Sequence, residues 1–358
     1  MTLKIGIIGC GGIANGKHMP ALKTVQDVEM VAFCDLIEER AEKAAVEYGG
    51  AEASVYTDYQ EMLANEALDV IHVCTPNSSH SAITVAALEA DCHVMCEKPM
   101  AKTTAEAQLM IEAAKRTGKK LTIGYQNRYR PDSMYLHEAC QDGDLGEIYF
   151  AKGHAIRRRA VPTWGVFLDE EAQGGGPLID IGTHALDLTL WMMDNYQPKY
   201  VVGKAYRKLA DTKDAANAWG PWDPEKFTVE DSAFGFIMME NGASIFLESA
   251  WALNSLDVKE AKTTLCGTKG GADMNDGLTL NGENRGHLFN NAIELETGGV
   301  DFYDGTGSDP AEVEAKMWID AILHDTELVV KPEEALVVTQ ILEGIYESSK
   351  TGQPYFFK

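Results

Sequence analysis

The feature that most constrains the fold is a glycine loop between a short apolar run and a helical pattern. Residues 3–8 form the apolar run, and the loop GCGGIA follows at once from Gly9 to Ala14. A second apolar run, Val28–Cys34, ends in Asp35. Glycines in such a loop allow a tight turn and the close approach of a pyrophosphate to a helix N-terminus, while the acid can accept hydrogen bonds from a ribose. The pattern predicts a dinucleotide site, the alternative being a glycine-rich turn that holds no nucleotide.

The residues beside Asp35 indicate which dinucleotide is bound. Leu36 and Ile37 come next, so no adjacent cation can meet the 2′-phosphate of NADP. Arg40 could supply that cation, although a place on a solvated helix face is the simpler interpretation. We therefore expect NAD in preference to NADP.

Apolar runs and helical patterns alternate through the first third of the chain. Strands that alternate with helices form parallel βαβ units, so the expected fold class is α/β with an N-terminal Rossmann doubly wound parallel sheet. We expect this NAD-binding domain to cover residues 1–124. After the second strand and a helix near 38–48, the expected segments are strands at 70–74, 92–96 and 121–124, and helices near 79–89 and 104–117.

The pattern changes after Gly124, and residues 125–358 are expected to form a second domain for substrate binding and oligomerisation. Glu147–Arg159 alternates as a strand does. The runs Val229–Glu240 and Ala243–Ala252 are joined by an Asn-Gly turn, which predicts a hairpin. Helices are expected near 309–324 and 332–349.

Charge and composition limit the partners. The 358 residues include 31 Lys and Arg against 55 Asp and Glu, a formal net charge of −24. Such a surface repels phosphate backbones and anionic lipid, so neither nucleic acid nor membrane is an expected partner. No run of 18 apolar residues occurs, and the first residues lack the pattern of a secretory signal. We expect a cytoplasmic location, where the seven scattered cysteines stay reduced.

One short segment invites a zinc interpretation. Cys92, His93 and Cys96 lie together, but strand alternation puts the two cysteines on one face and the histidine on the other. No second pair of ligands has suitable spacing, so no metal is expected.

Polar residues follow three of the expected strands, at the edge where ligands bind in such sheets. Residues 75–77 follow the strand 70–74, and His80 is interpreted as a surface histidine in the first turn of the next helix. Lys98, between Glu97 and a proline, could reach a substrate hydroxyl or the nicotinamide ribose, or could be an ordinary surface lysine. Two further candidates, Tyr125 and Gln126, follow the strand 121–124.

The second domain has its own candidates. Arg157–Arg159 could meet a substrate carboxylate or phosphate, or could pair with the abundant surface acids. Trp219 and Trp222 could stack on sugar rings or pin their loop. Asp180 and His184 are one helical turn apart after three glycines, with Asp187 on the same face. The pair could transfer a proton, or could be a capping aspartate and a core histidine.

Together, GCGGIA, Asp35, Glu97-Lys98-Pro99 and Asp180-x-Gly182-x-His184 resemble the Gfo/Idh/MocA (glucose–fructose oxidoreductase/inositol dehydrogenase) family, over essentially the whole chain. The resemblance implies an NAD-dependent oxidoreductase acting on a secondary hydroxyl of a sugar, glycoside or cyclitol. It also implies a C-terminal α+β domain with a mostly antiparallel open sheet, whose face makes homo-oligomer contacts in a dimer, tetramer or hexamer. The stretch 157–167 resembles the branch that oxidises sugars or glycosides at C3.

The resemblance also implies roles for individual residues. Lys98, Asp180 and His184 would be the catalytic set, with His184 taking the hydroxyl proton and Lys98 supporting the developing oxyanion. Inositol dehydrogenase and an NAD-retaining glycosidase of the same fold are the alternatives, and a non-enzymatic NAD sensor is a third. The expected cofactor contacts are Gly9, Gly11, Gly12, Ile13, Asp35, Thr75, Pro76, Asn77, His80, Glu97, Lys98 and Gln126. The expected substrate contacts are Lys98, Tyr125, Arg157, Arg159, Trp164, Asp180 and His184.

Overall fold

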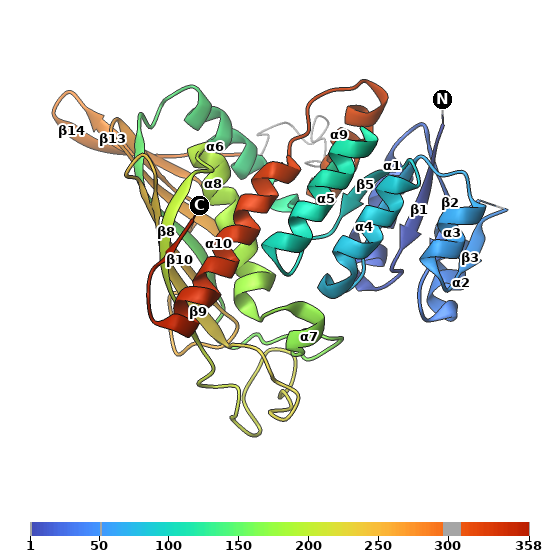
Figure 1. The fold of residues 1–358 in the computed structure, drawn as a ribbon. Coiled ribbons are helices and arrows are strands. Elements are labelled where there is room, and N and C mark those ends of the chain that lie inside the picture. Colours follow the sequence, from blue (N-terminus) through green and yellow to red (C-terminus); the bar gives the residue numbers. More distant parts are fainter. Residues whose placement is uncertain (1, 51, 296–308, 358) are drawn as a thin grey trace. The chain divides into compact units, whose positions relative to one another are not determined.

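The chain folds into two units, which the computed structural model describes over residues 2–50, 52–295 and 309–357 (Figure 1). The first unit is Met1–Tyr129 with Ser308–Leu336, and the second is Arg130–Gly307 with Val337–Lys358. The sequence analysis assigned all of 125–358 to the second domain. The difference arises because a late helix returns to pack on the first sheet, a long-range contact that a linear pattern does not reveal.

The first unit is built on a parallel six-stranded sheet in the order β3-β2-β1-β4-β5-β6. Its strands are β1 (Leu3–Ile8), β2 (Val28–Cys34), β3 (Ser54–Tyr56), β4 (Val70–Val73), β5 (His93–Cys96) and β6 (Leu121–Ile123). Its helices are α1 (Met19–Thr24), α2 (Glu38–Tyr48), α3 (Tyr59–Asn65), α4 (His80–Glu89), α5 (Thr104–Thr117) and α9 (Pro310–Leu323), with helical turns at Ala14–His18, Asn77–Ser79 and Gln126–Tyr129. The expected Rossmann fold is confirmed.

Local signals explain most of these boundaries. Thr103 and Glu106 form a capping box at the start of α5, and Gly118 ends that helix in the left-handed region. Every residue of β4 is buried, as expected for a central parallel strand covered on both faces. The sequence analysis did not identify β3 and α3, because three half-buried residues and two helical turns carry too short a pattern.

The second unit is built on a nine-stranded sheet in the order β14-β13-β12-β11-β7-β10-β9-β8-β15. Its neighbours are antiparallel except for the parallel pair β7–β10, so the expected mostly antiparallel sheet is confirmed. Its strands are β7 (Ile148–Ile156), β8 (Pro198–Tyr206), β9 (Ser232–Met239), β10 (Ser244–Ala250), β11 (Lys259–Gly267), β12 (Gly270–Asp273), β13 (Thr279–Asn284), β14 (His287–Ala292) and β15 (Tyr355–Phe356). Its helices are α6 (Pro131–Gln141), α7 (Glu170–Gln173), α8 (Thr183–Met193) and most of α10 (Pro332–Thr351), with a π-helical turn at Leu178–Gly182.

The two faces of this sheet differ. Helix α8 packs on β7 and β11, and Gly203 and Gly235 let Ile345 of α10 approach the backbone of β8 and β9. On the other face Phe246 makes ring contacts with Phe150 and Phe236, and its side chain is half exposed. The predicted hairpin is confirmed as β9–β10, with Gly242 in the left-handed region.

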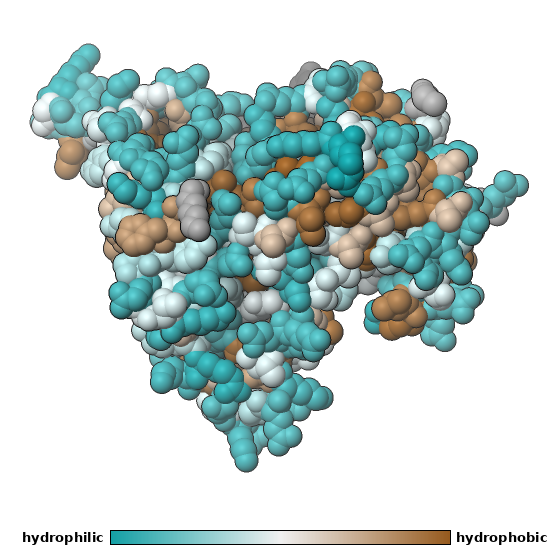
Figure 2. Space-filling view, viewed as in Figure 1, coloured by the Kyte–Doolittle hydropathy of each residue, from teal (hydrophilic) through white to brown (hydrophobic). Residues whose placement is uncertain are grey.

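Surface properties agree with the charge. The face drawn in Figure 2 is mostly hydrophilic. Across the described ranges, no helix has both the length and the apolar character needed to span a membrane. All seven cysteines are free thiols, and five of them are buried.

Candidate active site

The glycine loop after β1 has two kinds of glycine. Gly9 has a φ of +92°, and a Cβ there would lie 2.6 Å from the carbonyl oxygen of Cys74, so the fold itself requires glycine. A Cβ on Gly11 or Gly12 would meet nothing within 4 Å. The missing side chains therefore leave open space before the helical turn that begins at the buried Ala14. This fits a pyrophosphate resting against backbone N–H groups.

Asp35 lies at the carboxyl end of β2 and braces this loop. One carboxylate oxygen accepts the Cys10 N–H at 2.9 Å, and the other accepts the Ile37 N–H at 2.9 Å. A carboxylate oxygen can accept more than one bond, so both remain available to ribose hydroxyls. Leu36 and Arg40 are both exposed.

His80 ties together the loops that follow β4 and β5. Its Nδ1 lies 2.8 Å from the Pro99 carbonyl oxygen and its Nε2 lies 2.9 Å from that of Thr75. The ring is fully buried, and burial lowers the pKa of His80. The expected surface histidine is therefore wrong, because its partner at Pro99 is contributed by the next βα unit. His80 can shape the cofactor loops without touching a ligand.

Glu97, at the end of β5, anchors a buried charge cluster that the sequence analysis missed. Its Oε1 lies 2.8 Å from Lys17 Nζ and 2.8 Å from His18 Nε2. Lys17 also pairs with Glu314 of α9 at 2.9 Å, and His18 contacts His72 ring to ring at 2.9 Å between their Nδ1 atoms. Burial alone would raise the pKa of Glu97, but Lys17 and His18 hold it well below its usual range.

The same carboxylate holds the backbone of the next residue. Glu97 Oε2 accepts the Lys98 N–H at 3.0 Å, so the cluster fixes the chain where the candidate lysine begins. The Lys98 side chain is half-buried, and the Lys98–Pro99 peptide is cis. Glu97 and its partners therefore position the backbone of Lys98. The signal for this cluster in the sequence is the pair Lys17-His18, just before the helix α1.

Two residues that follow β6 have different surroundings. The Oε1 of Gln126 is buried and has no hydrogen-bond donor in the described structure. An orphaned buried acceptor at the ligand edge of the sheet fits an amide or hydroxyl donor from a bound cofactor. The Tyr125 side chain is fully buried, and its contact with substrate stays a prediction.

In the second unit, Asp180 lies in the π-helical turn and His184 in the first turn of α8. The Trp251 indole N–H donates to Asp180 Oδ2 at 3.0 Å. His184 is buried, and Asp180 is half-buried. The segment is therefore helical as expected, although Asp180 does not cap it.

Glu230 fixes the glycine-rich segment that leads into this turn. Its carboxylate accepts the N–H groups of Gly176 at 2.8 Å and Leu178 at 3.1 Å, and the Tyr346 hydroxyl at 2.9 Å. Burial raises the pKa of Glu230, despite these three donors. Sequence reasoning missed Glu230, since its partners lie 52 to 116 residues away along the chain.

The arginines follow β7 instead of extending it, because the strand ends at Ile156. The strand expected over Glu147–Arg159 is therefore shorter than predicted. Arg157 forms a two-point ion pair with Glu260, with one bond at 2.6 Å, as the ion-pair interpretation predicted. Arg159 donates to the Asn254 side-chain oxygen at 2.7 Å and to a backbone carbonyl.

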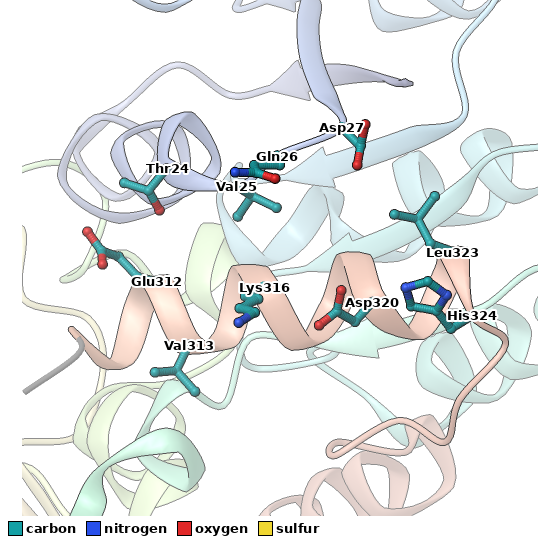
Figure 3. Close-up of a pocket in the computed structure, with 10 residues that line it drawn as sticks. All are labelled: Thr24, Val25, Gln26, Asp27, Glu312, Val313, Lys316, Asp320, Leu323 and His324. Carbon is teal, nitrogen blue, oxygen red and sulfur yellow. The ribbon is translucent and has the colours of Figure 1, made fainter. Parts of the chain in front are cut away.

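A pocket in the first unit lies apart from all of these residues. It is bounded by α9 and by the turn between α1 and β2, at the amino end of the strand (Figure 3). Its polar lining includes Asp27, Lys316, Asp320 and His324. The nucleotide loops follow carboxyl ends of strands, so this pocket is not the cofactor site.

Two of the residues considered for zinc binding, Cys92 and His93, form local hydrogen bonds. The Cys92 thiol donates to the Leu68 carbonyl at 3.3 Å, and His93 Nδ1 accepts the Lys120 N–H at 3.0 Å. These groups are used within the fold, and in the described residues no group of His, Cys, Asp and Glu side chains has the geometry of a metal site.

Comparisons with known proteins find relatives of this chain and solved structures with the same fold. A glucoside 3-dehydrogenase of Escherichia coli K12 is 36% identical over 98% of this chain and 96% of its own. An inositol 2-dehydrogenase of Salmonella typhimurium is 32% identical over 54% of this chain and 55% of its own. The solved structure of levoglucosan dehydrogenase with NADH has the same fold, with a TM-score of 0.83 at 20% identity over the whole of both chains.

Family models cover both units. Residues 3–125 match the model of the oxidoreductase family with an NAD-binding Rossmann fold, and residues 134–273 match the model of the GFO/IDH/MocA C-terminal domain. The protein is therefore a member of the Gfo/Idh/MocA family of oxidoreductases.

Proposed function

We propose that this protein is an NAD-dependent dehydrogenase that oxidises a secondary hydroxyl, at C3, of a glucoside. The observation that carries the proposal is the extent of the similarity to glucoside 3-dehydrogenase, which spans nearly all of both chains. It therefore includes both the glycine loop of the first unit and the Asp180–His184 turn of the second. The similarity to inositol 2-dehydrogenase supports a cyclitol as the alternative substrate.

Lys98, Asp180 and His184 are the proposed catalytic set. NAD supplies the hydride acceptor, so oxidation breaks the C–H bond and the O–H bond and leaves a ketone and a proton. His184 accepts that proton, and a positioned base of this kind contributes about 10²- to 10⁴-fold in rate. Asp180, held by Trp251, orients the histidine, and Lys98 stabilises negative charge on the reacting oxygen.

The preference for NAD over NADP rests on the surroundings of Asp35. A 2′-phosphate would meet the Asp35 carboxylate, and the next two residues, Leu36 and Ile37, are exposed and uncharged. The phosphate and the Asp35 carboxylate carry like charges and repel each other, so NADP is expected to bind much more weakly than NAD. Dissociation constants for both dinucleotides, measured by calorimetry, test this point directly.

We also propose that the protein forms homo-oligomers in the cytoplasm. The outer face of the second sheet exposes aromatic and aliphatic side chains that a second copy of the chain would cover, and the family resemblance implies such contacts. They include Val202, Tyr206 and Phe246. Seven free thiols favour a reducing compartment. Light scattering of the wild type and of Phe246→Lys tests the assembly, which the charged variant should weaken.

The activity test is absorbance at 340 nm. The protein is mixed with NAD and, separately, with methyl glucoside, glucose, a glucuronide and myo-inositol. A rise with the glucoside supports the proposal, and a rise with inositol alone favours the cyclitol alternative. No rise, with NAD released on denaturation, would point to an enzyme that retains and recycles its cofactor. His184→Ala should lose turnover while binding NAD normally, and full turnover of this variant would contradict the mechanism.

A matched pair of glycine variants tests the cofactor site. Gly11→Ala fills open space, so we expect a normal melting temperature and weakened NAD binding. Gly9→Ala collides with the Cys74 backbone, so we expect destabilisation. If Gly11→Ala bound NAD as the wild type does, the loop would not be the pyrophosphate site.

A further inference from the structure

Two half-exposed tryptophans lie next to the proposed catalytic turn of the second unit. Trp164 is 51% exposed and Trp219 is 45% exposed. Trp222, which lies with Trp219 in the insert between Lys208 and Phe227, is 3% exposed. The sequence analysis left open whether the insert tryptophans stack on sugars or pin their loop. The structure separates the two roles, because Trp222 donates its indole N–H to the Ala210 carbonyl at 2.9 Å and packs on Phe227.

The loops that carry the exposed rings are held by other bonds. Asn217 exchanges two hydrogen bonds with the backbone of Val161, at 2.8 and 3.0 Å. The Ala218 N–H donates to the Arg159 carbonyl, and the Thr163 hydroxyl donates to the Trp219 carbonyl. These bonds hold the loops through the backbone and Asn217, in addition to the contacts that the two indole rings make.

The exposed pair connects to Asp180 through aromatic contacts within one unit. Trp251 donates to Asp180 and lies 6.4 Å, centre to centre, from Phe167. Phe167 lies 5.9 Å from Trp164, and Trp164 lies 4.9 Å from Trp219 at an interplanar angle of 83°. Successive ring contacts thus link the exposed pair to the Asp180 turn through Phe167 and Trp251. A substrate that reacts at Asp180 and carries a second ring could extend onto the pair.

Arg157, which is paired with Glu260, lies beside the exposed tryptophan pair. The Arg157 guanidinium lies 5.5 Å from the Trp219 ring centre, and its pKa is raised: burial would lower it, but Glu260 and, to a lesser degree, Asp180 raise it. A guanidinium over an indole holds the ring in place and favours stacking of a planar or sugar ring beside it.

We propose that Trp164 and Trp219 form a subsite for the second ring of a glycoside, so that the preferred substrate carries a ring-shaped aglycone. This rests on the proposed function and names its substrate class. Both an aryl group and a second sugar present a face that stacks on indole, and they are distinguished by testing each separately.

The test compares kcat/KM for methyl glucoside, phenyl glucoside and a glucose disaccharide. In the wild type we expect the larger glycosides to be favoured over methyl glucoside. Trp219→Ala should lower that ratio by about threefold to tenfold, the range expected for loss of one aromatic contact. Tyr135→Ala, which removes an exposed ring on α6, should leave the ratio unchanged. Trp222→Phe should lower the melting temperature and keep the ratio.

Binding is measured in parallel by calorimetry, so that a failure of turnover does not hide the result. If no glycoside is oxidised but phenyl glucoside binds more tightly than methyl glucoside, and Trp219→Ala abolishes the difference, the subsite stands and the proposed function fails. If the wild type oxidises all three glycosides with equal kcat/KM, the subsite is overturned and the function stands. If neither turnover nor binding occurs, both are overturned.

Discussion

Glu97 in the first unit and Glu230 in the second are two buried carboxylates with the same structural task. Each accepts backbone N–H groups beside a proposed catalytic residue: Glu97 that of Lys98, and Glu230 those of Gly176 and Leu178, just before Asp180. Their electrostatics are opposite. Lys17 and His18 depress the pKa of Glu97, whereas burial raises that of Glu230.

The difference shows two ways of making a buried acceptor stable. Glu97 is an ion pair member whose charge is balanced by a lysine, and the buried lysine is itself held by two carboxylates. Glu230 depends on dipoles alone: two backbone N–H groups and the Tyr346 hydroxyl. A buried pair costs much to break, while a dipole-solvated acid is easily neutralised, so the two units should respond differently to substitution and to pH.

The largest expected effect follows from removing the lysine that pairs with Glu97, because Glu230 has no such cation among the described residues. Lys17→Met leaves Glu97 and Glu314 buried without their shared cation, so we expect a loss of about 3–5 kcal/mol in the free energy of unfolding at pH 7. The loss should be smaller at pH 5, where a carboxyl deprived of its partner becomes protonated. Urea unfolding at the two pH values measures both.

Lys23→Met provides the control, because Lys23 lies in the neighbouring helix α1 and is exposed. It should change the free energy of unfolding by less than about 0.5 kcal/mol. An equal loss in the two variants would mean that the charge of Lys17 does not stabilise the cluster.

A smaller effect is expected from Glu230→Gln. The amide replaces one acceptor by a donor that faces an N–H or hydroxyl group, so we expect a loss of about 1–3 kcal/mol. The segment before Asp180 should loosen, which lowers kcat but leaves the KM for NAD unchanged. Glu225→Gln, at an exposed site in the Lys208–Phe227 insert, is the matched control. A change in the KM for NAD with normal kcat would contradict the positioning role.

The same comparison explains which parts of the site were predictable. Gly9, Asp35 and Lys98 are candidates from the sequence because each is marked by its neighbours: a strand before it, a helix or proline after it. The bonds of Asp35 to Cys10 and Ile37 span 25 residues or fewer, within one βα unit and the strand beside it. Local pattern and local structure coincide there, so the Rossmann unit could be derived from the sequence.

Residues whose role depends on distant partners were not predictable. His80 was expected at the surface, yet Pro99 and Thr75 bury it. For Arg157 the sequence leaves two interpretations open, and its ion-pair partner Glu260 lies 103 residues away along the chain. Glu230 lies in an ordinary strand-like run, and nothing in its neighbours signals its contact with Gly176. Trp219 and Trp222 look alike in sequence, and packing alone separates them.

The pH dependence of the two glutamates should differ in sign. The folded-state pKa of Glu230 is raised above the ordinary value of 4.5. The protonated carboxyl therefore contributes stability that is fully present below pH 4.5 and is lost as pH rises through the folded-state pKa. The depressed pKa of Glu97 gives stability that is present above 4.5 and lost only as pH falls through the folded value. The penalty of Glu230→Gln should therefore be larger at pH 5 than at pH 8, and that of Glu97→Gln nearly equal. If the penalties of Glu230→Gln and Glu97→Gln changed with pH in the same way, the predicted difference between the two glutamates would be wrong.

The smallest expected effect comes from removing one of the three donors to Glu230. Tyr346→Phe deletes the hydroxyl that lies 2.9 Å from Oε1, so we expect a loss of about 0.5–1.5 kcal/mol, measured by urea unfolding. A Cβ on Gly175 would lie 2.0 Å from that hydroxyl oxygen, so Gly175→Ala alone must displace the tyrosine. In the Tyr346→Phe background the closest contact is a ring carbon at 2.8 Å, and the alanine should cost less. A double-mutant cycle measures this relief as a favourable coupling energy. A coupling of zero would mean that Gly175 and Tyr346 do not share the space beside Glu230.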